Sequence, residues 1–322
     1  MGASHLPGRH GDAHGDSAGT PWAGRTLTDS PFAGDDGGLA PALATLLERA
    51  RTTQEPVDVE ELLRVLPGAR LFVPVTAVSA GTYEATGGDL GADMAIPTLR
   101  SPDGRDALPV FTSVEALTAW SAKARPVPVE ARRAAVSAVQ EGQQLLVLDP
   151  GVSGPAGSVV VPRPALWALA QGEPWTPSYR DPEVAAAVAR AAETVGAVGG
   201  RCEPGPGAGA GGELRVVVDV VPGLSEASLG WVHHQVPKLL AASEVVAERV
   251  DSVVLEVHEL AGPVVVVRRR AGALLHHWQS IVFSARDGRA HQGANATVTR
   301  WGAERSARRA ARQTGAVVLD GQ

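Results

Sequence analysis

One stretch of the chain, from Ala92 to Ala116, constrains the fold more than any other. Two short apolar runs, Met94 to Leu99 and Leu108 to Phe111, flank the sequence Ser-Pro-Asp-Gly at residues 101–104. These residues are typical of a tight turn, because proline presets φ, aspartate bonds its own backbone and glycine accepts a positive φ. The stretch therefore predicts a β-hairpin.

A helix is predicted directly after the hairpin. Thr112 and Glu115 have the spacing of a capping box, in which each side chain bonds the backbone amide of the other residue. Val114, Leu117 and Trp120 follow at helical spacing. We therefore expect a strand-strand-helix unit, with Thr112 as the helix N-cap.

The same residues carry a resemblance to a known family. The segment ALPVFTSVEAL is similar to the signature of the SseB family, whose N-terminal domain presents an LPVFTS segment before a helix. The resemblance includes GRTLTDSPFAGDDGG, ARLFVPV, VQEGQQLLVLDP and VVVPRPALWALAQGEPW. Over residues 20–195 the chain resembles the long form of the family found in high-GC Gram-positive bacteria. Residues 213–257 have a weaker similarity to the family's C-terminal region. The resemblance implies a small α/β domain and brings no established catalytic residue.

The order of predicted elements indicates the fold class. Apolar periodicity and β-branched runs predict helices at 39–51, 57–66, 129–140, 165–171 and 182–195, and strands at 71–78, 145–149 and 159–162. Helices and strands do not alternate strictly. We therefore expect an α/β (α+β) fold with a mixed sheet covered by helices.

Composition divides the chain into five parts. Residues 1–38 are expected to form a flexible arm, 39–195 the SseB-like domain and 196–212, rich in glycine, a linker. A strand at 214–221, a helix at 225–242 and a strand at 252–257 predict a small βαβ unit within 213–260. Residues 261–322 have the Ala/Arg/Gly bias of an unstructured tail.

Residues with catalytic or metal-binding chemistry are scattered. Gly151 to Gly154 is one residue short of a nucleophile elbow, and the single cysteine, Cys202, lies in the expected linker. His233 and His234 are adjacent on a predicted helix, so they point to different faces and do not share a metal. We expect no catalytic, cofactor or metal site, and we favour a non-enzymatic protein.

The aromatic residues give the best candidate for an interaction surface. Trp120 and Trp167 have the spacing of helix-face core residues, whereas Trp175 lies between two prolines in GEPWTP, where burial is harder. We name Trp175, Phe111 and Trp120 as the candidate surface. The first hypothesis is a protein-interaction or regulatory protein with an unknown protein partner. The alternative is a small-molecule-binding protein or enzyme, with a pocket at the loops Gly81 to Gly91 and Pro150 to Gly157.

Charge is distributed unevenly along the chain, and the chain has a single cysteine. Net charge is −6, but residues from Gly262 onward carry +7 and the rest −13. Arg305, Arg308, Arg309 and Arg312 fall at helical spacing. We favour a solvated tail over contact with phosphates because the domains are acidic, so a nucleic-acid partner, bound weakly through this tail, is only the third hypothesis. One cysteine and no long apolar run favour the cytoplasm and no membrane partner. The sequence gives no indication of oligomeric state.

Overall fold

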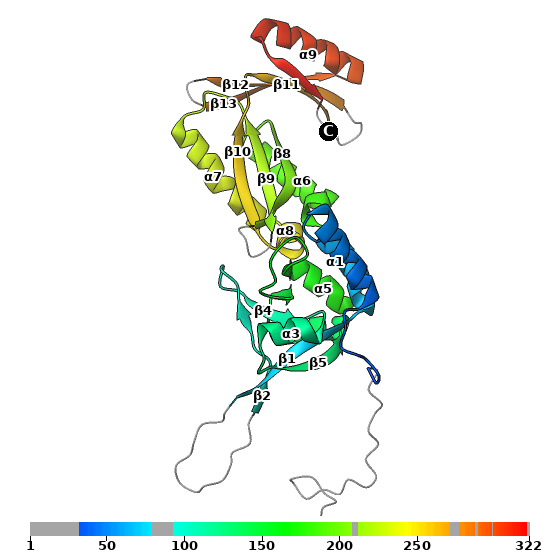
Figure 1. Ribbon diagram of the computed structural model, residues 1–322. Coiled ribbons are helices and arrows are strands. Elements are labelled where there is room, and N and C mark those ends of the chain that lie inside the picture. The colour runs from blue at the N-terminus through cyan, green and yellow to red at the C-terminus, as the bar shows by residue number, and fades with distance from the viewer. Residues whose placement is uncertain are drawn as a thin grey trace, which may run out of the picture. The chain divides into compact units, whose positions relative to one another are not determined.

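The computed structural model describes residues 32–78, 93–207, 212–270, 277–286, 289–297 and 299–320. Contacts divide the chain into residues 1–36 and residues 37–322. Most of the arm expected over 1–38, and the whole loop expected over Gly81 to Gly91, lie outside the described residues. The larger unit combines helices with several mixed sheets, which confirms the α/β fold class (Figure 1).

The first half of the larger unit contains two sheets and their covering helices. Its elements are α1 (Pro41–Thr53), α2 (Val59–Val65), η1 (Leu66–Gly68), β1 (Arg70–Val78), β2 (Asp93–Ala95), β3 (Leu99–Arg100), β4 (Asp106–Val110), α3 (Val114–Trp120), β5 (Arg125–Glu130), α4 (Ala131–Gln140), β6 (Leu145–Leu148), β7 (Val159–Val161) and α5 (Arg163–Gln171). One sheet has the strand order β2-β1-β5 and is antiparallel. The other has the order β3-β4-β6-β7, with β4 and β6 parallel.

A single hydrophobic cluster, which we call the first core, joins these elements. Helix α1 contributes Leu43, Leu46, Leu47 and Ala50, all buried, as their helical spacing predicts. The strands contribute Leu71 and Leu146, and α5 contributes Leu166, each fully buried. The periodicity of the sequence was sufficient to predict the buried residues of α1, because this helix has one apolar side.

The central hairpin is shorter than predicted. Strands β3 and β4 pair antiparallel around a turn closed by the Gly104 N–H, which donates to the Ser101 carbonyl at 2.9 Å. Met94 lies instead in β2, which pairs with β1. The N-cap prediction was wrong by one residue: Ser113 caps α3 by accepting from the Ala116 N–H, because the side chain of Thr112 is bound to Asp149.

Residues Arg125 to Glu130 form β5, and the first two residues of the helix predicted over 129–140 belong to this strand. Strand β5 pairs with β1 over its whole length, and Pro126 lies opposite Pro74. A residue before proline avoids the helical region, so two prolines at alternate positions favour an extended chain. Helix α4 therefore begins only at Ala131.

The second half of the larger unit begins with a second core. Its elements are η2 (Ser178–Arg180), α6 (Pro182–Thr194), β8 (Gly199–Gly207), β9 (Gly212–Val220), α7 (Glu226–Ala241), α8 (Glu244–Arg249) and β10 (Val253–Glu259). Strands β9 and β10 are parallel and connected through α7, as the predicted βαβ unit requires. Helix α6 packs here, through Val184 and Val188, against Val216 and Val236.

The linker expected over 196–212 is wrong for residues 199–207, which form β8. Strand β8 pairs antiparallel with β9. A Cβ at Gly200 would lie 2.9 Å from the Ala192 Cβ, so this glycine lets β8 approach α6 closely. A glycine-rich sequence is compatible with both a linker and a closely packed strand, and only the neighbouring helix distinguishes them.

The described part of the expected unstructured tail is also folded. It contains β11 (Val264–Arg270), β12 (His277–Arg286), β13 (Arg289–Thr297), α9 (Arg300–Thr314) and β14 (Val317–Asp320), and the strand order is β13-β12-β11-β14. Valines of β11 are buried on both faces, and α9 covers one face (Figure 1). The Ala/Arg bias is that of an amphipathic helix whose apolar side uses alanine.

No helix in the described ranges is long and apolar enough to cross a membrane.

Candidate functional site

Two of the three residues predicted for an interaction surface, Phe111 and Trp120, pack against each other. Phe111 is fully buried, and Phe72 and Phe111 exchange backbone hydrogen bonds of 2.8 and 2.9 Å. The half-buried Trp120 packs on Phe111 with ring centroids 5.3 Å apart. Phe111 is therefore a core residue and leaves the candidate surface, because it directly follows β4 and packs in one cluster with Leu117 of α3.

Trp175, the third predicted residue, lies in a surface groove. The groove has a volume of about 590 Å³ and is lined by α5, the segment after it and α8. Trp175 is half-buried against the first core, whereas Trp167 of α5 is 46% exposed instead of buried as expected. Pro164 and Pro174 complete the apolar lining. We call this site the tryptophan groove.

The charged residues of the tryptophan groove are unequally paired. Arg249 forms ion pairs with Asp181 at 3.0 Å and Glu183 at 2.8 Å, so its charge is compensated. Glu173 and Glu248 also line the groove, and neither forms an ion pair with a described residue. The groove therefore presents two carboxylates that form no ion pair with a described residue, together with Arg163 and two indole rings.

The Trp175 side chain has one unsatisfied polar group. Its indole Nε1 is buried and has no hydrogen-bond partner within the described parts of the chain. A buried donor without an acceptor is unfavourable, so such groups mark strain or a missing partner.

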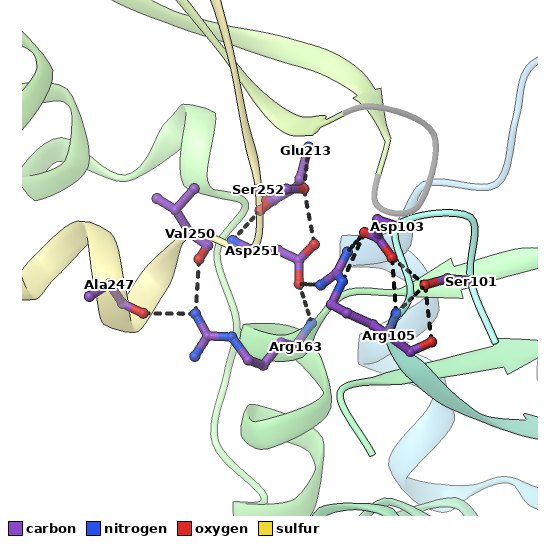
Figure 2. Close-up of polar contacts among 9 residues, drawn as sticks. All are labelled: Ser101, Asp103, Arg105, Arg163, Glu213, Ala247, Val250, Asp251 and Ser252. Atoms are coloured by element: carbon purple, nitrogen blue, oxygen red, sulfur yellow. Dashed lines mark hydrogen bonds and ion pairs between the residues drawn. The ribbon is translucent and has the colours of Figure 1, made fainter. Parts of the chain in front are cut away.

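A polar cluster centred on Asp251 fixes the two helices that flank the groove. The Asp251 side chain is fully buried, and its Oδ1 accepts from Arg105 Nη1 at 2.6 Å and from the Arg163 N–H at 3.0 Å. Arg163 Nη2 donates to the carbonyls of Ala247 at 2.7 Å and Val250 at 3.0 Å. Figure 2 shows these contacts converging from the β3–β4 turn, the start of α5 and the end of α8.

A second buried carboxylate, Glu213, lies next to Asp251. Glu213 Oε2 accepts from the Asp251 N–H at 3.2 Å (Figure 2). Glu213 Oε1 accepts from Ser178 Oγ at 2.9 Å. Burial raises the pKa of the Glu213 carboxyl, and the hydrogen bonds oppose this shift. The Asp103 carboxylate, by contrast, has its pKa lowered to about 2 by its hydrogen bond with Arg105.

Glu213 also lines a second cavity of about 570 Å³, together with Trp175 and Tyr179. Gly154 and Pro155 contribute to its wall, so one of the two loops predicted to form a pocket does line one. The other predicted loop, Gly81 to Gly91, lies outside the described residues.

Cys202, His233 and His234, which the sequence offered for catalysis or metal binding, do not line the tryptophan groove or the second cavity. Thr112 donates to Asp149 through its N–H at 2.8 Å and its hydroxyl at 2.7 Å, and burial raises the pKa of this carboxyl. Burial also raises the pKa of the Cys202 thiol to about 11. His233 and His234 are both exposed. The described residues contain no group of three or more potential metal ligands.

The Asp251 cluster could not be found from the sequence. Arg105, Arg163 and Asp251 are far apart in the chain, and each sits in a locally ordinary turn or helix end. Trp175 could be named as a candidate from the sequence because a tryptophan between two prolines is an unusual local context.

Comparison with known proteins assigns the first part of the chain. Residues 43–168 match the SseB protein N-terminal domain, and this range includes Trp167 and most of the first core. No curated protein and no solved structure matches the chain. The resemblance of residues 213–257 to the family's C-terminal region stays a prediction. Residues 43–168 are therefore identified as an SseB protein N-terminal domain.

Proposed function

We propose that this protein is a non-enzymatic interaction protein whose tryptophan groove binds an extended, basic peptide segment of a protein partner. The observation that carries the proposal is the exposed Trp167 in one groove with Trp175, where Glu173 and Glu248 form no ion pair with a described residue.

The chemistry of the groove supports this class of ligand. Extended peptides commonly dock in grooves with aromatic walls, where the indole faces pack on proline or aliphatic side chains. An indole face also attracts a lysine or arginine side chain through its quadrupole. Glu173 and Glu248 add Coulomb attraction for the same cation, which favours a basic peptide over an acidic one.

Trp175 supports the proposal through its unsatisfied N–H. A peptide backbone offers carbonyl acceptors at every residue, so a small rotation of the indole on binding would pair this donor. The cytoplasm is the compartment we propose, since a chain with one cysteine cannot form an internal disulfide.

The test begins with selection of peptides that bind the intact protein from a displayed library of random 12-residue sequences. Affinities of the selected peptides are then measured by fluorescence anisotropy for the wild type, Trp167→Ala and Glu248→Gln. Trp231→Ala is the matched control, because Trp231 is 48% exposed on α7 and does not line the groove.

The expected peptides are enriched in lysine or arginine, and Trp167→Ala weakens their binding at least about 30-fold, the effect of a central aromatic hot spot. Glu248→Gln should weaken binding less and reduce its salt dependence. Trp231→Ala should bind like the wild type. Equal binding by the wild type and Trp167→Ala, or selection of acidic peptides, would reject the proposal.

A second function is favoured by the cavity that Glu213 lines. Its wall combines apolar residues with one buried carboxylate of raised pKa, an arrangement suited to a small ligand with a hydrogen-bonding or basic group. Native mass spectrometry of the purified protein should then show a bound small molecule that is lost in Glu213→Gln. Detection of the unliganded mass alone would argue against this alternative.

A further inference from the structure

Helix α9 has one face committed to the fold. Ala303 and Ala307 are fully buried against Val265 and Val267 of β11. Small side chains there let the helix lie close to the sheet. The apolar side of α9 is therefore already occupied.

The opposite face of α9 is cationic. Trp301, Arg305, Arg308 and Arg312 recur at spacings of four, three and four residues and are all exposed, and Arg309 lies beside them. At 1.5 Å per residue, this row extends over about 16 Å. We call these five residues the α9 stripe.

The charges of the α9 stripe are not neutralised within the described parts of the chain. Glu304, the acidic residue of α9, pairs with Arg300 at 2.8 Å. Arg308, Arg309 and Arg312 form no ion pair with a described residue. Trp301 is 68% exposed, and the Arg305 guanidinium lies 5.1 Å from its ring centroid. The stripe thus combines free cations with an open aromatic face.

We propose that the α9 stripe binds single-stranded nucleic acid, with the arginines on successive phosphates and Trp301 stacked on a base. Proteins bind single strands through this combination of a positively charged track and aromatic stacking platforms. The charge distribution is complementary, because residues from Gly262 onward carry +7 while the rest of the chain carries −13. The strand is therefore attracted to the end that bears α9 and repelled elsewhere.

A membrane surface fits the α9 stripe less well. An interfacial helix needs a broad apolar face to insert among lipid chains. The alanines of α9 face the sheet, and Trp301 is the only large apolar side chain in the stripe. An aromatic platform with an adjacent guanidinium favours a ligand with planar rings.

Counterion release predicts the size of the effect. Four arginines on phosphates of a single strand give a slope of log K against log salt near −0.7 for each contact, about −2.8 in total. Raising the salt concentration from 50 to 200 mM should then weaken binding about 50-fold. At 50 mM salt, each phosphate contact contributes about eightfold to the affinity.

The experiment uses the full chain and fluorescein-labelled dT20 and rU20, with fluorescence anisotropy at several salt concentrations. The first variant combines Arg308→Gln, Arg309→Gln and Arg312→Gln, since glutamine preserves helix propensity. The second is Trp301→Ala. The matched control combines Arg125→Gln, Arg133→Gln and Arg190→Gln, which removes the same charge from exposed positions outside α9. Far-UV circular dichroism verifies that each variant is folded.

The triple α9 variant should lose on the order of 500-fold in affinity at 50 mM salt and about two units of salt slope. Trp301→Ala should lose at least about fivefold with the slope unchanged, because stacking releases no counterions. The control triple should retain most of the affinity. The proposal is overturned if neither oligonucleotide binds at 50 mM salt, if the control triple loses as much as the α9 triple, or if the protein binds phosphatidylserine vesicles but not the oligonucleotides.

Discussion

Asp251 is the residue whose replacement tests the Asp251 cluster most directly. Asp251→Asn keeps the shape of the side chain and removes its charge. The Asn Oδ1 can still accept from the Arg163 N–H, and Ser252 Oγ, which donates to Asp251 Oδ2 at 3.0 Å, can turn to accept from the new amide. The main loss is therefore the charge opposite Arg105, at 2.6 Å.

The expected cost follows from burial. The Asp251 side chain is fully buried and that of Arg105 is 16% exposed. Breaking a buried pair by removing one partner costs about 3–5 kcal/mol, because the other charge stays in a poor solvent. Arg105 keeps an ion pair with Asp103 at 2.7 Å, so we expect the lower end, about 3 kcal/mol.

Urea unfolding followed by tryptophan fluorescence measures this cost. A loss of about 3 kcal/mol should lower the midpoint by ~1 M or more. Asp103→Asn is the control: its side chain is 42% exposed, so its cost should stay below about 1 kcal/mol. The double variant Asp251→Asn with Arg105→Gln should cost about 2 kcal/mol less than the sum of the costs of the two single variants. A cost of Asp251→Asn below about 1 kcal/mol, or simple additivity, would refute this account of the cluster.

Three other predictions concern the second core. Gly200→Ala should destabilise the protein by about 1–3 kcal/mol in thermal unfolding, because the new Cβ would lie 2.9 Å from the Ala192 Cβ. Gly199→Ala is the control and should be nearly neutral, because a Cβ there would have no atom within 4 Å. Equal effects of the two substitutions would argue against the packing of β8 on α6. Cys202 should react with a thiol reagent at pH 8 about 100-fold more slowly in the native state than in urea, since its pKa is about 11 against 9.0. Burial raises the pKa of Glu213 above its ordinary 4.5, so the native state binds more protons above that pH, and the stability of the wild type relative to Glu213→Gln should fall as pH rises from 4.5 to 7; a difference independent of pH would contradict this.

Elements whose signals are local were predictable from the sequence. Helix α1 was predicted because it has one apolar face, and strand β6 was predicted because it is a short apolar run. The β9–α7–β10 unit was found for the same reason. Elements whose form depends on a neighbour were missed. Strand β5 pairs with β1, and β8 packs closely on α6 at Gly200.

The candidate site was only partly predictable. Trp175 was named from its proline context, but Phe111 was misplaced because its burial depends on the α3 packing above β4. The exposure of Trp167 reverses the expectation that an aromatic at helical spacing faces the core. Asp251 has no local signal, since its partners come from turns and helix ends distant in the chain.

The place of α6 in the second core determines where the chain can be divided for expression. A fragment that stops at residue 195 would carry α6 without the strands it covers, leaving a row of valines and alanines open to water: Val184, Ala187, Val188, Ala191 and Ala192. Such a surface promotes self-association in solution. A fragment that stops after Thr176 keeps Trp175 on its own core and leaves Ser178 with the second fragment, where it bonds Glu213. Fragments of this protein are therefore best divided between α5 and α6, before the glycine-rich stretch that the sequence indicates as the domain boundary.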